Sequence, residues 1–421
     1  MRVIILNDFA YVNGGASQIA IYTAKKMAEE GIDTCLFTGA GPIDKDIKNK
    51  KNLKIICLNQ YDILTDPNRL RAIIQGIWNY KAKKVFKDLL LSEYDKNDTV
   101  IHVHTCQKVL SSSCIKIAKK LGYKVIYHMH DYGIACPNLG FYNYKKRCIC
   151  EKKAMSIACL KENCDSRKYF HKLWRVCRHY VQENIVSMSK NIDCFIAVSD
   201  FSLNILKEYL PTNKKIKVLP NPIDIKYNKK IDVVKNKKII YIGRLSPEKN
   251  PVLLAKCAKD LKISVIFIGD GICKKEIKKI NPNAEVTGWI SKNEMEKYLI
   301  EARALVMTSL WYETQGLVAL EAAAYGIPVI APNTCAITDF IEDNKNGLIF
   351  KSNNEFSLRN KIVEILDNKR AQKLSNNSYN YYLKYSEISK CYIANLLELY
   401  SSIIVKNHME KDLYDVNKCN N

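Results

Sequence analysis

Short runs of β-branched and other apolar residues alternate with longer stretches of helical spacing along most of this 421-residue chain. In the first half, the runs RVIIL, DTCLFTG, LKIICL, TVIHVH, YKVIYHMH and CFIAVS predict strands, and residues 16–30 and 68–92 predict helices. The alternation restarts with KKIIYIGR, ISVIFIGD, AEVTGW, ALVMTS and PVIA. Strands that alternate with crossover helices are typical of parallel sheets, so the chain is expected to be an α/β protein with two doubly wound domains.

The segment KVLPNPIDIKYNKK, residues 217–230, interrupts this rhythm with prolines and polar residues and is interpreted as a linker. We therefore expect a first domain over residues 1–222 and a second over 231–385. Residues 386–406 are expected to form a helix that packs back on the first domain, and the polar residues 407–421 a flexible tail. In open parallel sheets, ligands bind beyond the carboxyl ends of the strands, so the cleft between the domains is the expected site.

The run from Gly316 to Tyr325 is almost wholly apolar, yet it contains the ionisable Glu321, eight residues after Glu313. A helix that is apolar nearly all round is buried, and Gly326 can cap its end. Glu321 is therefore either a partner in a buried ion pair or cap interaction, or a ligand-binding group. Glu313 lies in the loop that leads to the helix N-terminus, which favours a bound anion. A carboxylate that binds hydroxyl groups, next to a site that binds phosphate, is what a nucleotide-sugar pocket requires.

Several motifs extend this interpretation to a family. ETQGLVALEAAAYGIPVI (313–330) resembles the Glu-x7-Glu signature of retaining glycosyltransferases of family 4, which have the GT-B fold of two Rossmann-like domains facing a cleft. YIGRLSPEKNP (241–251) is similar to that family's Gly-Arg-Leu-x-x-x-Lys-Asn segment, and IGDG, TGWI and ITDFIEDNKNGLIF follow at the expected places. NGGAS and LPNPID resemble its first loop and its linker. Where the family has Pro-Phe-Gly or similar after the first Glu, this chain has Thr314-Gln315-Gly316, which leaves the identity of the sugar open.

The resemblance implies roles for the charged residues of these motifs. Arg244 and Lys249 are expected to bind the donor diphosphate, Glu321 the ribose hydroxyls and Glu313 hydroxyls of the transferred sugar. A guanidinium fork and an ammonium group suit adjacent phosphate oxygens. Because a lysine at a helix N-terminus opposes the helix dipole, a bound anion explains Lys249 better than a pair of surface charges does. Ser246 as cap and Pro247 at the first helical position predict that helix start.

The remaining implied contacts come from small residues and one aromatic residue. The backbone amides of Gly316, Leu317 and Val318 are expected to face the phosphates. Gly288 and Trp289 are expected to lie near the nucleobase. The alternative for a lone Trp is a place in the core. A bare Gly-Gly pair is equally well explained by a tight turn. The donor-binding positions of this kind are Gly14, Gly15, Gly269, Gly288, Trp289, Gly316, Leu317 and Val318.

His130 ends the strand YKVIYHMH and matches by position the family's histidine near the reacting sugar. His104 and His128 also end strands, and a structural role is the simpler interpretation for these two. The candidate catalytic set is thus Glu313, His130, Lys249 and Arg244. We find no dedicated nucleophile, and the family is generally thought to use front-face attack. Cations at Arg244 and Lys249 are expected to do the work that Mg²⁺ does elsewhere, so no cofactor is required for catalysis.

A cysteine-rich insertion spans about residues 136–180. Cys136, Cys150, Cys159 and Cys164 are candidate ligands of a structural zinc ion, although their spacing lacks a Cys-x2-Cys pair. Free thiols or a disulfide are the alternatives. Such a zinc ion is expected to brace the acceptor loop and to take no part in chemistry.

The formal net charge is +23, and residues 1–222 hold 36 Lys or Arg against 20 Asp or Glu. In SRKYFHKLWRVCRHYVQEN, the apolar residues from Phe170 to Val181 follow helical spacing, and Lys168, Lys172, Arg175 and Arg178 lie mostly elsewhere on the wheel. This pattern predicts either a basic amphipathic helix on anionic lipid or an ordinary packed helix with a solvated basic face. No nucleic-acid motif accompanies the charge, so no nucleic-acid partner is expected.

These observations predict a retaining transferase that moves a hexose from a UDP- or GDP-sugar to a lipid-linked or growing polysaccharide acceptor. Without a long apolar run or a recognisable signal peptide, we expect it in the cytoplasm, peripheral on the inner face of the cell membrane. An inverting GT-B transferase and a sugar-nucleotide epimerase remain alternatives on the same fold. A non-catalytic nucleotide-sugar-binding scaffold is an alternative of a different class.

Overall fold

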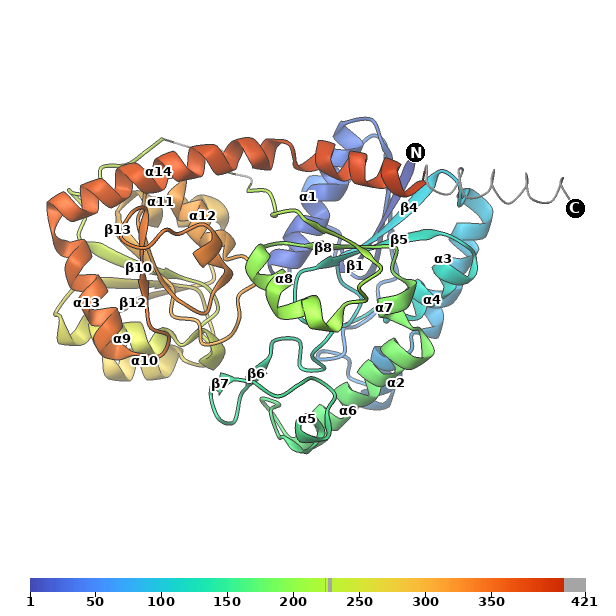
Figure 1. Ribbon diagram of the computed structural model, residues 1–421, viewed down its shortest axis with the longest axis horizontal. Helices are drawn as coiled ribbons and strands as arrows, with labels where there is room; N and C mark the ends of the chain where they lie inside the picture. Colours follow the sequence, from blue (N-terminus) through green and yellow to red (C-terminus); the bar gives the residue numbers. More distant parts are fainter. Residues whose placement is uncertain (224, 226–228, 405–421) are drawn as a thin grey trace, which may run out of the picture.

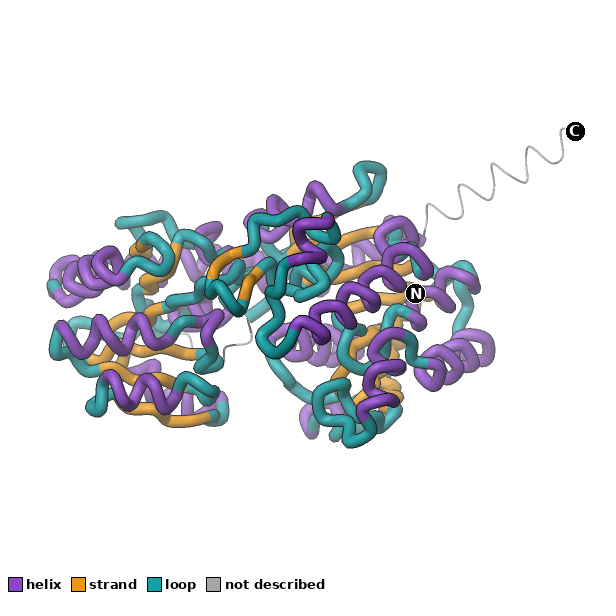
Figure 2. Tube along the Cα trace, turned by 90° about the horizontal axis from the view of Figure 1, so that it is seen from below, coloured by secondary structure: helices purple, strands orange, loops and turns teal. Residues whose placement is uncertain are grey.

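The computed structural model describes residues 1–223, 225 and 229–404, so the tail predicted over 407–421 and part of the predicted linker lie outside the described residues. Within these residues the chain forms two halves, each built on a parallel sheet (Figure 1). Figure 2 shows strands enclosed by helices in each half, with loops gathered where the halves meet. The expected α/β architecture of two doubly wound units is confirmed.

The first sheet has the order β3-β2-β1-β4-β5-β8-β9, with every neighbouring pair parallel. Its strands are β1 (Arg2–Phe9), β2 (Asp33–Ala40), β3 (Leu53–Cys57), β4 (Thr99–Val103), β5 (Lys124–Met129), β8 (Cys194–Ala197) and β9 (Lys215–Val218). The helices of this half are α1 (Gly15–Glu29), α2 (Arg69–Ile77), α3 (Tyr80–Glu93), α4 (Ser113–Lys120), α5 (Ile157–Lys161), α6 (Tyr169–Tyr180), α7 (Met188–Asn191) and α8 (Asp200–Leu206). A short antiparallel pair, β6 (Tyr142–Asn143) and β7 (Cys148–Ile149), lies in the cysteine-rich insertion.

The second sheet has the order β12-β11-β10-β13-β14-β15 and is also parallel. Its strands are β10 (Lys238–Ile242), β11 (Val265–Ile268), β12 (Glu285–Gly288), β13 (Ala302–Val306), β14 (Val329–Pro332) and β15 (Gly347–Phe350). Its helices are α9 (Pro251–Asp260), α10 (Lys274–Ile280), α11 (Lys292–Ile300), α12 (Leu317–Ala323), α13 (Glu355–Leu366) and α14 (Asn368–Lys390). The sheets thus occupy residues 2–218 and 238–350.

Two predicted elements differ from the structure for local reasons. The helix expected over 68–92 is broken between α2 and α3, because Asn79 caps α3 by accepting from the amide of Ala82 at 2.9 Å. The Asn79 amide group also donates to the carbonyl of Val109 at 2.7 Å, which anchors the break to the core. The start predicted at Ser246 is a single 3₁₀ turn, and α9 begins only at Pro251. The Ser246 hydroxyl makes no cap and bonds Glu248 instead.

The last part of the described chain returns to the first half. Residue 385 lies inside α14, which therefore starts well before the helix that we expected over 386–406, and residues 392–404 are helical again after Cys391. In Figure 1, α14 runs along the half that holds the second sheet, and the helical segment that follows it reaches the first half. Tyr392, Leu396 and Tyr400 are buried in the same core cluster as Val3 and Ile5 of β1. The Tyr392 hydroxyl contacts that of Thr23 in α1 at 3.1 Å. The segment 392–404 thus completes the hydrophobic layer on one face of the first sheet.

Candidate functional site

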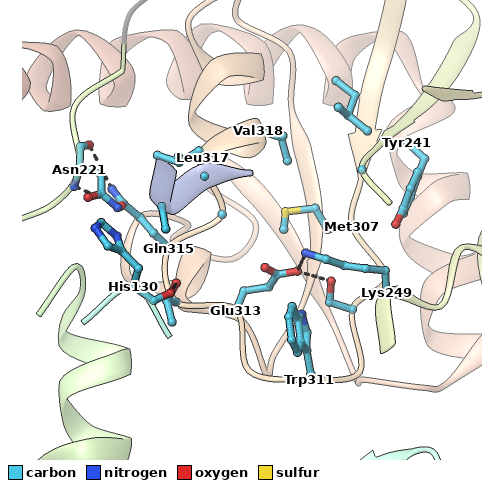
Figure 3. A pocket seen from close by; sticks show the side chains of 17 residues that line it. His130, Asn221, Tyr241, Lys249, Met307, Trp311, Glu313, Gln315, Leu317 and Val318 are labelled. Carbon is cyan, nitrogen blue, oxygen red and sulfur yellow. Dashed lines mark hydrogen bonds and ion pairs between the residues drawn. The ribbon is translucent and has the colours of Figure 1, made fainter. Parts of the chain in front are cut away.

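A cavity of about 280 Å³ lies between the two halves, at the carboxyl ends of strands from both sheets (Figure 3). This is where parallel sheets place their ligands. The first half contributes the start of α1, the residue after β5 and the segment that follows β9; the second half contributes the ends of β10 and β13 and the loop into α12. The lining residues are Gly15, Ala16, His130, Asn221, Tyr241, Ile242, Gly243, Lys249, Met307, Ser309, Trp311, Glu313, Thr314, Gln315, Gly316, Leu317 and Val318.

The charged centre of the cavity is an ion pair between Lys249 and Glu313, whose side chains point at one another in Figure 3. The Ser309 hydroxyl donates to the same carboxylate oxygen at 2.5 Å, and the Lys249 ammonium lies 5.3 Å from the centroid of the Trp311 ring. Burial raises the pKa of Glu313, but the charge and hydrogen bonds of Lys249 and Ser309 outweigh it and hold that pKa below its ordinary value. The Glu313 carboxyl is therefore ionised at neutral pH and is held by Lys249 and Ser309.

The two residues that depart from the family pattern connect the halves. The Thr314 hydroxyl donates to the backbone carbonyl of His130 at 3.1 Å, and the Ser199 hydroxyl donates to the carbonyl of Thr314 at 2.6 Å. The Gln315 amide oxygen accepts from the backbone N–H of Asn221 at 3.1 Å, and its amide nitrogen donates to the hydroxyl of Tyr385 at 2.7 Å. These side chains are thus used for contacts between the halves.

Backbone geometry explains several of the glycines. Gly316 adopts φ of 83° just before α12, a left-handed conformation that disfavours a side chain, and Gly14 has φ of 108° just before α1. A Cβ on Gly15 would lie 3.7 Å from the Leu317 side chain across the cleft. A Cβ on Gly269 would lie 2.0 Å from the carbonyl oxygen of Gly243, so Gly269 is required for the close approach of two strand ends. That reason is structural and needs no donor contact.

His130 lines the cavity and belongs at the same time to a group of buried histidines. Its Nε2 lies 2.8 Å from Nδ1 of His104, and its ring stacks on His128 at a centroid distance of 4.1 Å. Burial lowers the pKa of His130 to about 3, so its imidazole is neutral at physiological pH. Its side chain can therefore act as a neutral hydrogen-bonding group at the edge of the cavity.

Six other predicted positions are not among the residues that line this cavity. Arg244 is mostly exposed and pairs with the buried Glu248 at 3.1 Å. Glu321 is buried in α12, and burial raises its pKa although Lys292 lowers it. Trp289 is 84% exposed, which excludes the core role that is common for a lone Trp. The remaining three are Gly14, Gly269 and Gly288, the last two of which form an isolated bridge.

Sequence reasoning missed much of the polar lining. Asn221 and Gln315 hold each other, and Ser309 holds Glu313, as described above. Tyr241 lies at the end of β10 and its hydroxyl donates to the carbonyl of Arg244 at 3.1 Å. The sequence did offer one signal for these residues. Each lies at or after the carboxyl end of a strand, where ligands of parallel sheets bind.

The four candidate zinc ligands line one very small cavity in the insertion. Within it, the buried Lys172 ammonium lies 3.4 Å from the sulfur of Cys159 and 3.2 Å from that of Cys164. Cys136 and Cys150 line the same space but, among the described residues, no three of these thiols form a close group of metal-ligand atoms. The zinc prediction therefore stays a prediction, with Lys172 between two of its ligands.

The sequence predicted that the basic side of α6 faces outward, but part of that side is buried in the structure. Lys172 and Arg178 are buried, and Arg178 donates to the carbonyl of Gln107 at 3.0 Å. Phe170 is instead 68% exposed, and Leu173 is also exposed. The inward cations satisfy acceptors of the insertion and the core. On the apolar side of α6, Phe170 and Leu173 are left exposed, whereas Trp174 packs against α2 and donates to the carbonyl of Ile73.

Comparison with known proteins places the chain in a family. The model of Glycosyltransferase Family 4 matches residues 13–227, and that of Glycosyl transferases group 1 matches residues 224–381. An uncharacterised protein of the cps region of Klebsiella pneumoniae is 28% identical over 291 residues, which cover 65% of this chain and 70% of that protein. The Escherichia coli UDP-Gal:α-D-GlcNAc-diphosphoundecaprenol α-1,3-galactosyltransferase is 25% identical over 226 residues, which cover 48% of this chain and 57% of the relative.

Solved structures show the same architecture. Anabaena HepE in complex with UDP-glucose superposes with a TM-score of 0.66 at 17% identity, over 94% of this chain and 99% of that one. The fold is therefore GT-B, with the cavity in the cleft that separates the two Rossmann-like units. With one family model matching more than half of its length and a second matching most of the remainder, the chain belongs to glycosyltransferase family 4.

Proposed function

We propose that this protein is a retaining hexosyltransferase that uses a UDP- or GDP-sugar and a lipid-linked or growing polysaccharide acceptor. The observation that carries the proposal is the Lys249–Glu313 pair, fixed on one half of an interdomain cavity and faced by His130 from the other. A diphosphate needs fixed positive charge, and a sugar needs acceptors for its hydroxyls. The pair supplies both within one site.

In this proposal, the sugar diphosphate enters between Lys249 and the backbone of Gly316, Leu317 and Val318. The ammonium moves from Glu313 toward the phosphate oxygens, where charge builds as the glycosidic bond breaks. Glu313 then accepts hydrogen bonds from sugar hydroxyls and stays ionised. Arg244, exposed at the edge of this region, exchanges Glu248 for the outer phosphate.

The retaining outcome is supported by the residues around the cavity. Glu313 is the one carboxylate among the described residues that line it, and it is already committed to Lys249 and Ser309. A double displacement needs a second carboxylate close to the reacting carbon. Front-face attack, in which the departing phosphate accepts the proton of the acceptor hydroxyl, needs none. Neutral His130 is proposed to bind the sugar rather than to remove that proton.

The acceptor side is proposed to face an anionic membrane. Exposed apolar side chains gather on α2 and α6, where Leu70 is 74%, Ile74 57% and Phe170 68% exposed. Arg69 and Arg167 line an apolar pocket of about 130 Å³ between these helices. Apolar groups flanked by cations suit the surface of an anionic bilayer. Among the described helices, none has the length and hydropathy needed to span a bilayer.

The experiment that tests the donor proposal is a thermal-shift screen of the purified protein with UDP-, GDP- and ADP-hexoses, because ligand binding raises the melting temperature by mass action. We expect a shift with a UDP- or GDP-sugar. The positive donor is then supplied with undecaprenyl-diphosphate-linked sugars, and the anomeric configuration of the product is measured by NMR. Retained configuration supports the proposal. Inversion, or binding without transfer or hydrolysis, contradicts it and favours the inverting or scaffold alternative.

A further inference from the structure

Four histidines form a buried column beneath the cleft side of the first sheet. His102 and His104 follow one another along and beyond β4, and His128 and His130 along and beyond β5, so alternation places all four on one face. The rings of His102 and His128 stack at 5.3 Å with an interplanar angle of 7°, and those of His104 and His130 stack at 5.0 Å. His102, His104 and His128 are at most 1% exposed.

The Nδ1 atoms of His102 and His104 have hydrogen-bond partners. Nδ1 of His102 lies 2.7 Å from the hydroxyl of Tyr400, and Nδ1 of His104 lies 2.8 Å from Nε2 of His130. If each Nδ1 carries the proton and donates it, Nε2 of both rings is left with a free lone pair. This is the arrangement of metal-binding histidines, whose second nitrogen is held by an outer partner that fixes the tautomer.

Other nitrogens of these rings have no hydrogen-bond partner among the described residues. They are Nε2 of His102, Nε2 of His104 and both nitrogens of His128, and all four are buried. A buried polar group without a hydrogen bond destabilises the folded state. The neighbouring positions of the same rows are Val100 and Ile126, which show that apolar side chains fit this face. Histidines at these places therefore call for a ligand that uses their lone pairs.

We propose that His102, His104 and His128 bind a divalent transition-metal ion of the zinc type. Each of the three residues offers one nitrogen, and these nitrogens lie within 4.8 Å of one another. Among the described His, Cys, Asp and Glu residues, these three form a group that could hold a metal ion. A tetrahedral ion with Zn–N distances of about 2.0–2.1 Å needs nitrogens about 3.4 Å apart, so the nitrogens would approach one another by about 1 Å. The parallel rings of His102 and His128 would also turn, because a metal ion lies in the plane of each ring that binds it. Metal ions bind a neutral imidazole through such a lone pair.

Three protein ligands leave a fourth position for water or hydroxide. The ion would join β4 to β5 and, through the hydroxyl of Tyr400, fix the segment 392–404 against the sheet. It would also set His104 and thereby orient His130 at the edge of the cavity. The role is structural and positioning, and it does not depend on which sugar the enzyme transfers.

The test measures metal in the full chain, expressed without a polyhistidine tag in medium containing zinc, copper, cobalt and nickel. We expect about one bound ion per chain by elemental analysis and, for zinc, an X-ray absorption shell of nitrogen at about 2.0–2.1 Å. A sulfur shell at about 2.3 Å would place the metal in the cysteine-rich insertion and overturn the proposal. Metal content at background in every medium would overturn it equally.

Variants give a second readout. His104→Leu/His128→Leu removes two ligands with side chains that suit a buried sheet face, and we expect its metal content to fall to background. Cys159→Ser and His171→Ala, which lie outside the column, are expected to keep the metal. A chelator should lower the melting temperature of the wild type and leave that of the double variant unchanged. If the double variant does not fold, the absorption spectrum of the wild type still decides between nitrogen and sulfur ligands.

Discussion

At the scale of single residues, the site depends on carboxylates whose surroundings differ. Glu313 is compensated by Lys249, and its pKa is lowered. Glu321 lies in the apolar α12, and burial raises its pKa in spite of Lys292. The first is ready to accept hydrogen bonds from a sugar. The second is held at a cost to the folded state.

Glu321→Gln is expected to stabilise the free protein at pH 7.5. Burial raises the folded-state pKa of Glu321, so the protonated carboxyl favours the folded state. This contribution to stability is complete below the unfolded-state pKa of about 4.3 and is lost as the pH rises through the folded-state pKa. The amide is neutral throughout, so the gain in melting temperature, about 2–4 °C per kcal/mol, should be present at pH 7.5 and disappear near pH 4. Glu398→Gln, at an exposed position, serves as control. An equal gain at both pH values would contradict this account.

Lys249→Ala is expected to lower kcat by about 10²–10³-fold, the loss typical of removing one group that stabilises transition-state charge. It also leaves Glu313 without its cation, which should lower stability by about 1–3 kcal/mol because the pair is only partly buried. Adding Glu313→Gln should restore the melting temperature but not the turnover. Steady-state kinetics and thermal melts of the four proteins in the cycle measure both effects. Recovery of turnover in the double variant would exclude the proposed role of Lys249.

Glu313 and Lys249 could be selected at this scale, because the motifs that hold them resemble those of the family, but their ion pair with each other was not predicted. Contacts that depend on distant segments could not. Nothing near Asn221 in the sequence indicates its bonds to Gln315, and nothing near Trp289 indicates that it is exposed. His104 and His128 were interpreted one at a time, since only the pairing of β4 with β5 shows that they form a group.

At the scale of elements, hydrophobic periodicity predicted the strands and most helices, but not which face of a helix turns inward. The apolar spacing in α6 was read correctly, yet its cations are the buried side. Lys172 and Arg178 find sulfur and carbonyl partners in the insertion and the core, which outweighs the burial of Phe170. The same applies to the break at Asn79, where a bond to Val109 ends one helix and begins another.

The exposed face of α2 and α6 predicts binding to anionic vesicles. Leu70→Ser/Phe170→Ser is expected to weaken flotation with phosphatidylglycerol vesicles by about tenfold or more, since each large apolar side chain contributes about 1.5–3 kcal/mol when buried. Phe356→Ser, which replaces a residue that is 72% exposed on α13 of the other half, is the matched control. Equal loss in the control, or binding of the wild type to neutral vesicles alone, would count against a specific anionic surface.

At the scale of the whole molecule, two adjacent residues hold the halves together above the cavity. Thr314 bonds the carbonyl of His130, and Gln315 bonds Asn221 and Tyr385. The family's common residues at these positions lack these donors and acceptors, so the departure concerns the relative placement of the two halves. The fold of each half could be predicted from alternation, whereas this placement could not.

Gln315→Ala is expected to loosen the contact between the two halves. Loss of these buried hydrogen bonds, about 1 kcal/mol each, should raise the donor KM by about tenfold and increase the radius of gyration measured by small-angle X-ray scattering. kcat should change less than KM, because Lys249 and Glu313 remain in place. Gln372→Ala on α14, away from the cavity, should change neither quantity. A fall in kcat with KM unchanged would assign Gln315 to the chemical step instead.

The return of residues 392–404 to the first sheet has a consequence for synthesis. The layer they supply lies almost four hundred positions downstream of β1, the first strand it covers. On the ribosome, the amino-terminal half must therefore wait with part of one apolar face uncovered while the entire carboxyl-terminal half is translated. A chain stopped before Tyr392 would expose that side permanently, and such fragments should require chaperones or precipitate.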